Sequence, residues 1–271
     1  MDREKVLALY DRQIRLGTQP YEEGARVERV GGVLRHVGPP GGWHGVLWSD
    51  LDDETADAAI AAQVRLFREL GGEVEWKTYA HDRPADLGAR LTAAGFVAEE
   101  RETLLVAETA ALPLDTAPPE GIRLVPVTGE AHIALVEAVH ARAFDHESSH
   151  IAQQIRRQLA DDPDTVPAVL ALHGDEPVSA ARLELNPGTD FAGLWGGGTV
   201  PEWRGRGIYR AVVAYRARIA AERGYPYLQV DATEYSRPIL ERLGFEVLGT
   251  TTPYTLPMDT AEQDPTAPRG R

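Results

Sequence analysis

A proline-rich interruption near the middle of the sequence most constrains how this chain can fold. Residues 110–121 read AALPLDTAPPEG, and their three prolines and small side chains break any helical or strand period. The interruption divides the 271 residues into parts of about 110 and about 150 residues, and each is long enough to bury its own core. We therefore expect two domains, at residues 1–110 and 121–257, joined by a linker at 111–120 and followed by a flexible tail at 258–271.

The charge balance and the residue inventory exclude several classes of protein. The chain holds 28 Lys and Arg against 42 Asp and Glu, and the excess is shared: 13 basic against 20 acidic residues up to Ala110, and 15 against 22 after it. Long-range repulsion of phosphate disfavours a role in coating nucleic acid. The absence of cysteine excludes disulfides, thiolate zinc sites, iron–sulfur clusters and a cysteine nucleophile, and we expect no metal site. An acidic first segment, with no apolar run near the roughly 18 residues of a membrane span, favours a cytoplasmic protein.

Hydrophobic periodicity places helices and strands in both parts of the chain. In the second part, strands are expected at residues 121–127, 166–172, 177–185, 191–200, 227–231 and 245–255, and helices at 131–144, 151–159, 208–224 and 238–243. In the first part, helices are expected at 56–70 and 87–94, and strands at 73–79 and 97–106. This mixture predicts the α/β (α+β) fold class.

The two parts end alike. Both contain an Arg-Pro pair after a strand and a Gly-Phe pair after a short helix: Arg83-Pro84 with Gly95-Phe96, and Arg237-Pro238 with Gly244-Phe245. This succession indicates an internal duplication, with chance similarity of two αβ units as the alternative.

Glycine and arginine cluster at the junction between the strand at 191–200 and the helix at 208–224. In Arg204-Gly205-Arg206-Gly207 the glycines let successive backbone N–H groups converge on one anion at a helix start. From Val200 to Tyr225 six arginines stand against two glutamates, which reverses the sign of charge found in the rest of the chain. The segment predicts a diphosphate site. The arginines farther along the helix are expected to face solvent: Arg216, Arg218 and Arg223.

Other glycine-rich motifs differ in residue type. A P-loop needs Lys followed by Ser or Thr after its last glycine, and this segment has no Lys. A dinucleotide fingerprint follows the first strand of its unit, whereas this segment follows an antiparallel run. Two Arg-Gly repeats between structured elements also do not make a single-stranded RNA binder.

One family combines these features. Arg204-x-x-Gly207 after a strand ending in Thr199-Val200-Pro201, with Leu243-Gly244-Phe245 about 40 residues later, resembles the GNAT superfamily of acetyl-CoA-dependent N-acetyltransferases over residues 121–256. The resemblance implies a tandem GNAT-like fold, with a mixed, mostly antiparallel sheet flanked by helices in each half. It also implies acetyl-CoA as cosubstrate, its diphosphate at the loop and its pantetheine arm along the preceding strand. The cofactor-binding residues implied are Thr199, Val200, Arg204, Gly205, Arg206, Gly207, Ile208 and Tyr209.

The chain departs from the family pattern at two positions. Tyr209 occupies the last small position of the loop, so its ring must point away from the diphosphate. Family members often place a Tyr four residues before the Gly of the Gly-Phe pair, as the general acid toward the leaving thiolate. Here that position is Leu240, and Tyr235 or Ser236 are the substitutes.

The base is expected among carboxylates near the strands that flank the cofactor. The candidates are Glu184, Asp190, Asp231 and Glu234, each with the alternative of a turn or surface carboxylate. His140 and His146 are further options for a base. The catalytic set expected is Glu184, Asp231, Glu234, Tyr235 and Ser236.

The first part resembles a degenerate copy of the same fold. Its presumed loop, residues 49–54, is acidic where phosphate would sit, and with Asp57 it holds five carboxylates. We expect this half to bind no cofactor, and to pack on the other half or shape the acceptor pocket. Residues at a strand end are candidates to line that pocket, although core packing and turn formation explain them as well: Trp76, Tyr79, His81 and Asp82.

The resemblance implies an acyltransferase that moves acetyl from acetyl-CoA directly to an amine. A small-molecule or peptide amine is the expected partner, without nucleic acid or membrane, and the acidic surface favours a cationic one. A homodimer is left open. The alternative is a non-catalytic CoA-binding or sensing protein that keeps the fold, favoured by Leu240 and Tyr209.

Overall fold

The computed structural model describes residues 1–20, 23–39, 42–144, 152, 155–156, 159–160 and 168–257. Contacts divide the chain into two compact units, which we call the C-terminal unit (residues 1–14 and 103–248) and the N-terminal unit (residue 15 to 102, and 249 onward). The units are discontinuous, unlike the continuous ranges expected at 1–110 and 121–257, because the chain passes between them after residues 14, 102 and 248. The expected tail at 258–271 lies outside the described residues.

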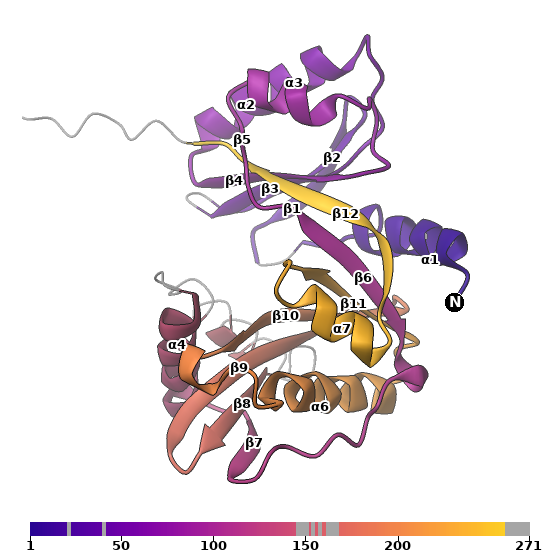
Figure 1. The fold of residues 1–271 in the computed structure, drawn as a ribbon. Helices are drawn as coiled ribbons and strands as arrows, with labels where there is room; N and C mark the ends of the chain where they lie inside the picture. The colour runs from indigo at the N-terminus through magenta and orange to yellow at the C-terminus, as the bar shows by residue number, and fades with distance from the viewer. Residues whose placement is uncertain are drawn as a thin grey trace, which may run out of the picture. The chain divides into compact units, whose positions relative to one another are not determined.

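The C-terminal unit is built on a six-stranded sheet with the order β6-β11-β10-β9-β8-β7 (Figure 1). All neighbouring strands are antiparallel except β10 and β11, which are parallel. Its elements are α1 (Arg3–Tyr10), η1 (Asp11–Arg15), β6 (Glu102–Glu108), η2 (Thr109–Ala111), β7 (Ile122–Pro126), α4 (Glu130–Phe144), β8 (Ala168–His173), β9 (Glu176–Leu185), β10 (Phe191–Thr199), η3 (Pro201–Trp203), α6 (Ile208–Glu222), β11 (Tyr227–Ala232) and α7 (Arg237–Leu243). Within η1 and β6, the end residues Arg15 and Glu102 belong to the other unit.

The N-terminal unit has the strand order β1-β2-β3-β4-β12, and β5 also pairs with β12. Only β3 and β4 are parallel, and helices α2 and α3 lie together on one side of the sheet (Figure 1). Its elements are β1 (Arg26–Val30), β2 (Val33–Val37), β3 (Trp43–Ser49), α2 (Ala56–Leu70), β4 (Glu73–Tyr79), α3 (Leu87–Ala93), β5 (Val97–Ala98) and β12 (Glu246–Thr255), of which the residues from 249 belong to this unit.

The strand expected at 97–106 is wrong as a single element. It is divided into β5, which pairs with β12 in the N-terminal unit, and β6, which pairs with β11 in the C-terminal unit. The chain leaves one unit after Glu102 and enters the other. The alternation of residues 97–106 is therefore continuous in sequence, although its two ends pair with strands of different units. The other expected strands begin and end within two residues of the predicted positions, and so do the expected helices, except the one at 151–159, which lies largely outside the described residues. Helix α1 and strands β1, β2 and β3 are not among the elements expected from the sequence.

Both units share one plan. An antiparallel run ends in a strand that lies parallel to the next one, and a helix of 15 residues joins the two: β3, α2 and β4 in one unit, and β10, α6 and β11 in the other. This repetition supports the internal duplication. It also makes the segment before α2 the counterpart of the segment before α6.

The sheet of the C-terminal unit has two different faces. Leu183 and Leu185 of β9 pack in the core beneath α6, with Val213 and Ala217 of that helix. Because side chains alternate along a strand, Arg182 and Glu184 face the other side of the sheet. Helix α4 packs on that second side, where His140 hydrogen-bonds β10.

Candidate functional site

The segment between β10 and α6 turns twice through left-handed backbone conformations. Gly205 has φ 74° and Gly207 has φ 86°, and α6 begins at the next residue, Ile208. L-residues with a side chain rarely adopt these angles, so conformation requires glycine here. A side chain at Gly205 would meet no steric obstacle, because nothing lies within 4 Å of a Cβ placed there.

The start of α6 presents unused donors. No acceptor among the described residues receives the backbone N–H groups from Arg206 to Arg210, and the first helical bond at this end is from Ala211 N to Gly207 O at 3.3 Å. Gly207, at the cap position, supplies no side chain to satisfy them. A helix start with free N–H groups and the positive end of the helix dipole attracts anions. The expected diphosphate site therefore has suitable geometry.

Arg204 holds the loop in place. Its Nε donates to the carbonyl of Thr199 at 3.0 Å, and its Nη2 donates to the carbonyl of Ala143 at 2.8 Å. The guanidinium thus joins the end of β10 to the last turn of α4. Arg206 lies with its guanidinium carbon 4.6 Å from the ring centre of Trp203, which leaves its charge at the exposed edge of the loop.

Tyr209 points its ring into the protein. A Cβ placed on Gly197 of β10 would lie 3.2 Å from the Tyr209 ring and 3.6 Å from Arg216. Burial raises the pKa of Tyr209, and the neighbouring Arg216 opposes that shift. The ring therefore points away from the backbone of the loop, as expected from the sequence, although the residue is large.

Arg216 corrects an expectation. It does not face solvent but is 1% exposed, with Nη1 donating to the carbonyl of Arg182 at 2.9 Å and Nε to that of Val212 at 3.2 Å. Burial lowers the pKa of Arg216 to about 10, with Tyr209 opposing the shift. A buried guanidinium is tolerated when carbonyl oxygens and a hydroxyl surround it.

Strand β10 diverges from β11 beyond its first residues. The parallel pairing covers only Phe191 to Gly193, and the register with β9 shifts between Trp195 and Gly198. This bulged stretch holds Gly196, Gly197 and Gly198, of which Gly196 has φ 56°. Beyond Gly193 the backbone of β10 therefore offers polar groups on the side toward β11, where an extended ligand could add like a strand.

Polar side chains gather on the sheet face opposite α6. The register places Glu184 and Gln229 on either side of Gly193, and a Cβ on Gly193 would collide with Trp195 Nε1 and lie 2.8 Å from Gln229 Nε2. Burial raises the pKa of Glu184, and the charge of Arg182 partly opposes that. A carboxyl with a raised pKa on such a surface suits proton transfer.

The structure brings together only some of the expected catalytic residues. Glu184 lies beside Gly193, and β11 carries Asp231 two residues after Gln229, on the same side of the sheet. Glu234 and Tyr235 are exposed on the connection between β11 and α7, Tyr235 at 80%. Ser236 donates to the carbonyl of Thr233 at 3.3 Å. These catalytic roles stay predictions.

The other candidates make structural contacts. Asp190 accepts from Gln13 Nε2 at 2.9 Å, and its N–H donates to Gln13 Oε1 at 2.8 Å. Leu240 is fully buried beneath the sheet. His146 lies outside the described residues.

The strand-end residues of the N-terminal unit are also engaged within that unit. Trp76 packs in the core, its ring centre 6.2 Å from that of Phe96. The remaining residues lie around Arg15. Its Nη2 pairs with a carboxylate oxygen of Asp82 at 2.8 Å, and its guanidinium carbon lies 3.9 Å from the ring centre of Tyr79. Turn and core formation thus explain these residues, and their place in an acceptor pocket stays a prediction.

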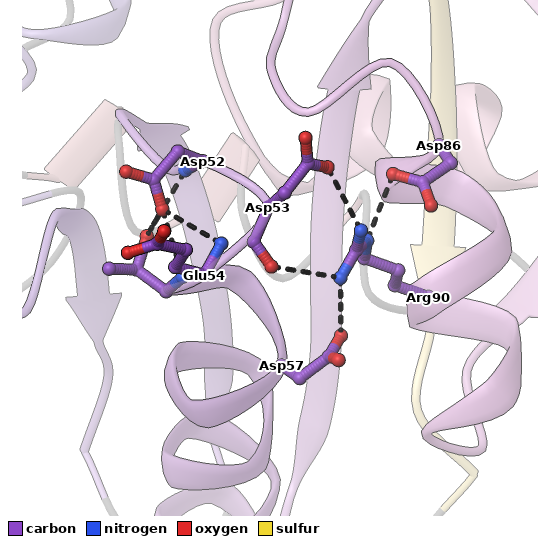
Figure 2. A network of polar contacts seen from close by, with 7 residues as sticks. Asp52, Asp53, Glu54, Asp57, Asp86 and Arg90 are labelled. Atoms are coloured by element: carbon purple, nitrogen blue, oxygen red, sulfur yellow. Dashed lines mark hydrogen bonds and ion pairs between the residues drawn. The ribbon is translucent and has the colours of Figure 1, made fainter.

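The start of α2 is organised differently from that of α6. Asp52 Oδ1 accepts from the N–H of Glu54 at 3.1 Å and of Thr55 at 2.9 Å, and its carbonyl accepts from Ala56 N at 3.0 Å. Figure 2 shows Arg90 of α3 pairing with two carboxylates at this helix start, Asp53 at 3.0 Å and Asp57 at 3.1 Å. It also pairs with Asp86, the residue before its own helix, at 2.9 Å. The N–H groups of Glu54, Thr55 and Ala56 thus have acceptors within the segment, whereas those of Asp57 and Ala58 have none among the described residues.

Sequence reasoning missed several residues of this region. The alternation Arg182-Leu183-Glu184-Leu185 in an otherwise apolar strand was a usable signal for a polar face. Nothing local indicated that Trp195 and Gln229 would meet over Gly193, because their contact depends on the pairing of strands β10 and β11. In the described ranges, no helix combines the length and apolar character needed to cross a bilayer.

Comparisons with known proteins agree with this architecture. Residues 133–245 match the model of the acetyltransferase (GNAT) family. A GCN5-related N-acetyltransferase from Kribbella flavida superposes with a TM-score of 0.68 at 16% identity, over 94% of this chain and 96% of its own. A tandem GNAT protein from the clavulanic acid biosynthesis pathway gives 0.59 at 16% identity, over 89% and 85%. No curated protein matched. The identities are low, so the structural matches establish the fold: two GNAT-like halves.

Proposed function

We propose that this chain, whose C-terminal half carries a GNAT domain, transfers acetyl from acetyl-CoA directly to an amine. The observation that carries the proposal is the start of α6, where N–H groups from Arg206 to Arg210 have no acceptor among the described residues. They lie in the arginine-rich stretch of an otherwise acidic chain, and the match to the GNAT family spans them. Amides and a positive potential together favour a diphosphate.

The strand before the loop fits the rest of this cosubstrate. Beyond Gly193, β10 has no regular pairing with β11, so the backbone polar groups on that side of the strand are available to an extended amide-containing chain. A pantetheine arm carries amides of that kind. Thr199 and Val200, at the end of this strand, lead directly into the loop that receives the diphosphate.

The reaction proposed needs no covalent enzyme intermediate. The base takes one proton from the ammonium, and the nitrogen then attacks the thioester carbonyl carbon. The bond to sulfur breaks, and the second proton lost by the nitrogen balances the protonation of the departing thiolate to the thiol. A backbone N–H of β10 polarises the carbonyl. Glu184 is the base that we favour, because it lies on the polar face beside the diverging strand and burial raises its pKa.

The acceptor proposed is a cationic small-molecule or peptide amine. Both halves of the chain are acidic, with a net charge of −14 overall, which favours the encounter with a cation. A cytoplasmic location is part of the proposal. The second candidate is a CoA sensor without turnover, which the buried Leu240 favours because it stands where the family often places an acid.

Two measurements test the proposal. Calorimetry with CoA measures binding, and thiol release from acetyl-CoA across a panel of amines measures turnover. We expect CoA to bind with micromolar affinity and at least one cationic amine to give steady thiol release. Binding without turnover across the panel would support the sensor, and absent binding would exclude both.

A pH profile then tests Glu184. A base must be deprotonated, and a raised pKa moves the acidic limb of kcat/KM above the ordinary glutamate value of 4.5. Activity should therefore fall as pH decreases through that limb, and Glu184→Gln should lower kcat about 100-fold and remove the limb. The matched control is Glu176→Gln, on the same strand but exposed at its beginning. An unchanged acidic limb in Glu184→Gln would exclude this residue as the base.

A further inference from the structure

The last turn of α4 lies directly against the glycine stretch of β10. His140 is fully buried, and its Nε2 lies 2.8 Å from the carbonyl oxygen of Gly196. A carbonyl only accepts, so Nε2 carries a proton and donates it. A Cβ on Gly198 would lie 2.7 Å from the ring of Phe144 and 3.1 Å from Ala143 Cβ. The glycines thus allow α4 to approach the backbone of β10 closely.

The carbonyl that His140 holds belongs to the bulge. Two residues of β10, Gly196 and Gly197, stand opposite one residue of β9, because Trp195 pairs with Arg182 and Gly198 with Ala180. The peptide between them is outside the regular register, and glycines give it little conformational restriction. A donor from outside the sheet is therefore needed to fix its orientation.

Fixing this carbonyl also fixes an N–H. In a trans peptide the C=O of Gly196 and the N–H of Gly197 point in opposite directions. Ser179 Oγ donates to another carbonyl of the stretch, Gly198 O, at 2.7 Å. The two side-chain donors together hold the backbone groups of residues 196–198 in one arrangement.

The same turn of α4 also holds the loop before α6. Ala143, three residues after His140, accepts from Arg204 Nη2 at 2.8 Å, and Arg204 Nε donates to Thr199 O at 3.0 Å. The end of α4 thus hydrogen-bonds both the bulge of β10 and the segment at the start of α6. Both are the parts of the backbone that the proposed reaction uses.

We propose that His140 is a positioning residue of the transfer reaction: its Nε2–H orients the Gly196–Gly197 peptide of β10 so that the strand presents an N–H to the acetyl carbonyl. The inference rests on the proposed function and adds a residue to it. His140 does not act as a base through Nε2, because that atom donates to a carbonyl. Without the donor the peptide can rotate, and misdirecting one such N–H lowers the rate without removing the diphosphate site.

The test uses a matched pair of variants at this position. His140→Phe keeps an aromatic ring beside Phe144, 5.4 Å away between ring centres, but removes the donor. His140→Gln restores a donor at a similar reach. His132→Phe is the control, since it makes the same change in the same helix at a residue that contacts Thr128 rather than β10.

The measurements are kcat, KM for the amine, the CoA dissociation constant, the melting temperature, and hydrogen exchange of residues 196–198 in the ligand-free protein. We expect His140→Phe to lower kcat about 10- to 100-fold and leave the CoA dissociation constant within about threefold. Exchange at residues 196–198 should become faster. His140→Gln should recover most of kcat, and His132→Phe should match the wild type.

Two outcomes would overturn the inference. One is a folded His140→Phe protein with wild-type kcat. The other is an equal loss of kcat and melting temperature in His140→Phe and His140→Gln, since that indicates a packing role alone. If the wild-type protein binds no CoA, the proposed function fails and the inference with it. If it binds CoA and turns over normally while either overturning outcome occurs, only the role of His140 fails.

Discussion

The helices α2 and α6 follow equivalent strands but begin in opposite ways. At α6, Gly207 caps the helix without a side-chain hydrogen bond, and N–H groups from Arg206 to Arg210 meet no acceptor among the described residues. At α2, Asp52 accepts the N–H groups of Glu54 and Thr55, and carboxylates surround the first turn. The same fold plan therefore leaves the start of α6 open to an external anion, whereas at α2 the preceding turn uses several N–H groups and carboxylates of the chain surround the rest.

The second residue of each helix shows the same contrast. In α6 this residue is Tyr209, whose ring packs inward against Gly197 and Arg216. In α2 it is Asp57, whose side chain is 75% exposed and pairs with Arg90 at 3.1 Å. A carboxylate there would repel phosphate, whereas a ring turned inward leaves the N–H accessible. The two units share a backbone plan. They differ in the charge at the helix start and in how many of its N–H groups already have an acceptor.

The largest expected effect comes from giving α6 the acidic start of α2. Gly207→Asp places a carboxylate among the free N–H groups, so CoA binding should weaken on the order of 100-fold. Calorimetry with CoA measures this effect. Asparagine has nearly the same shape and tolerates the left-handed conformation of this position, which has φ 86°.

Gly207→Asn is therefore the matched control for charge. It should weaken CoA binding only about threefold, since it adds a side chain without a negative charge. Equal dissociation constants for the two variants would show that charge at this helix start does not decide binding. The proposed difference in CoA binding between the starts of α6 and α2 would then have to be explained by their shape.

A second effect concerns the inward ring of Tyr209. Tyr209→Phe removes the hydroxyl beside the buried Arg216, and the loss should cost about 1–3 kcal/mol of unfolding free energy. Chemical denaturation measures it. The control is Tyr215→Phe in the same helix, because the Tyr215 hydroxyl has no partner among the described residues and its loss should change little. Equal stability of both variants would mean that the hydroxyl does not support Arg216.

These contrasts also show what could be predicted from sequence. The loop from Arg204 to Gly207 was recognisable because glycine conformation and charge are local properties, and the acidic segment before α2 was recognisable for the same reason. The burial of Arg216 was not, because a helical arginine is normally solvated and only the carbonyls of Arg182 and Val212 make this place favourable. The division of residues 97–106 into two strands depends equally on distant partners, β12 and β11.

A third, smaller effect tests whether the acidic start of α2 is a structural cap. Asp52→Ala removes the acceptor of two N–H groups, so the melting temperature should fall by about 2–4 °C. Asp52→Asn keeps an oxygen acceptor and should lose less. Neither change should affect CoA binding, because the cosubstrate is proposed to bind only at α6. A CoA affinity altered by Asp52→Ala would contradict the assignment of one site to the C-terminal unit.

The smallest effect sharpens the electrostatic side of the comparison. Asp53, Asp57 and Asp86 share one cation, Arg90, whose pKa is raised by the hydrogen bonds and charges of Asp86 and Asp57. Arg90→Gln leaves these carboxylates facing one another, and since they are largely exposed the loss of stability should be smaller than that from Asp52→Ala. Salt screens repulsion between exposed charges, so the difference in melting temperature between Arg90→Gln and the wild type should narrow as sodium chloride rises from 0.01 M to about 1 M. A difference that stays constant over this range would mean that Arg90 supports the start of α2 through packing, and that the contrast with α6 is not one of charge.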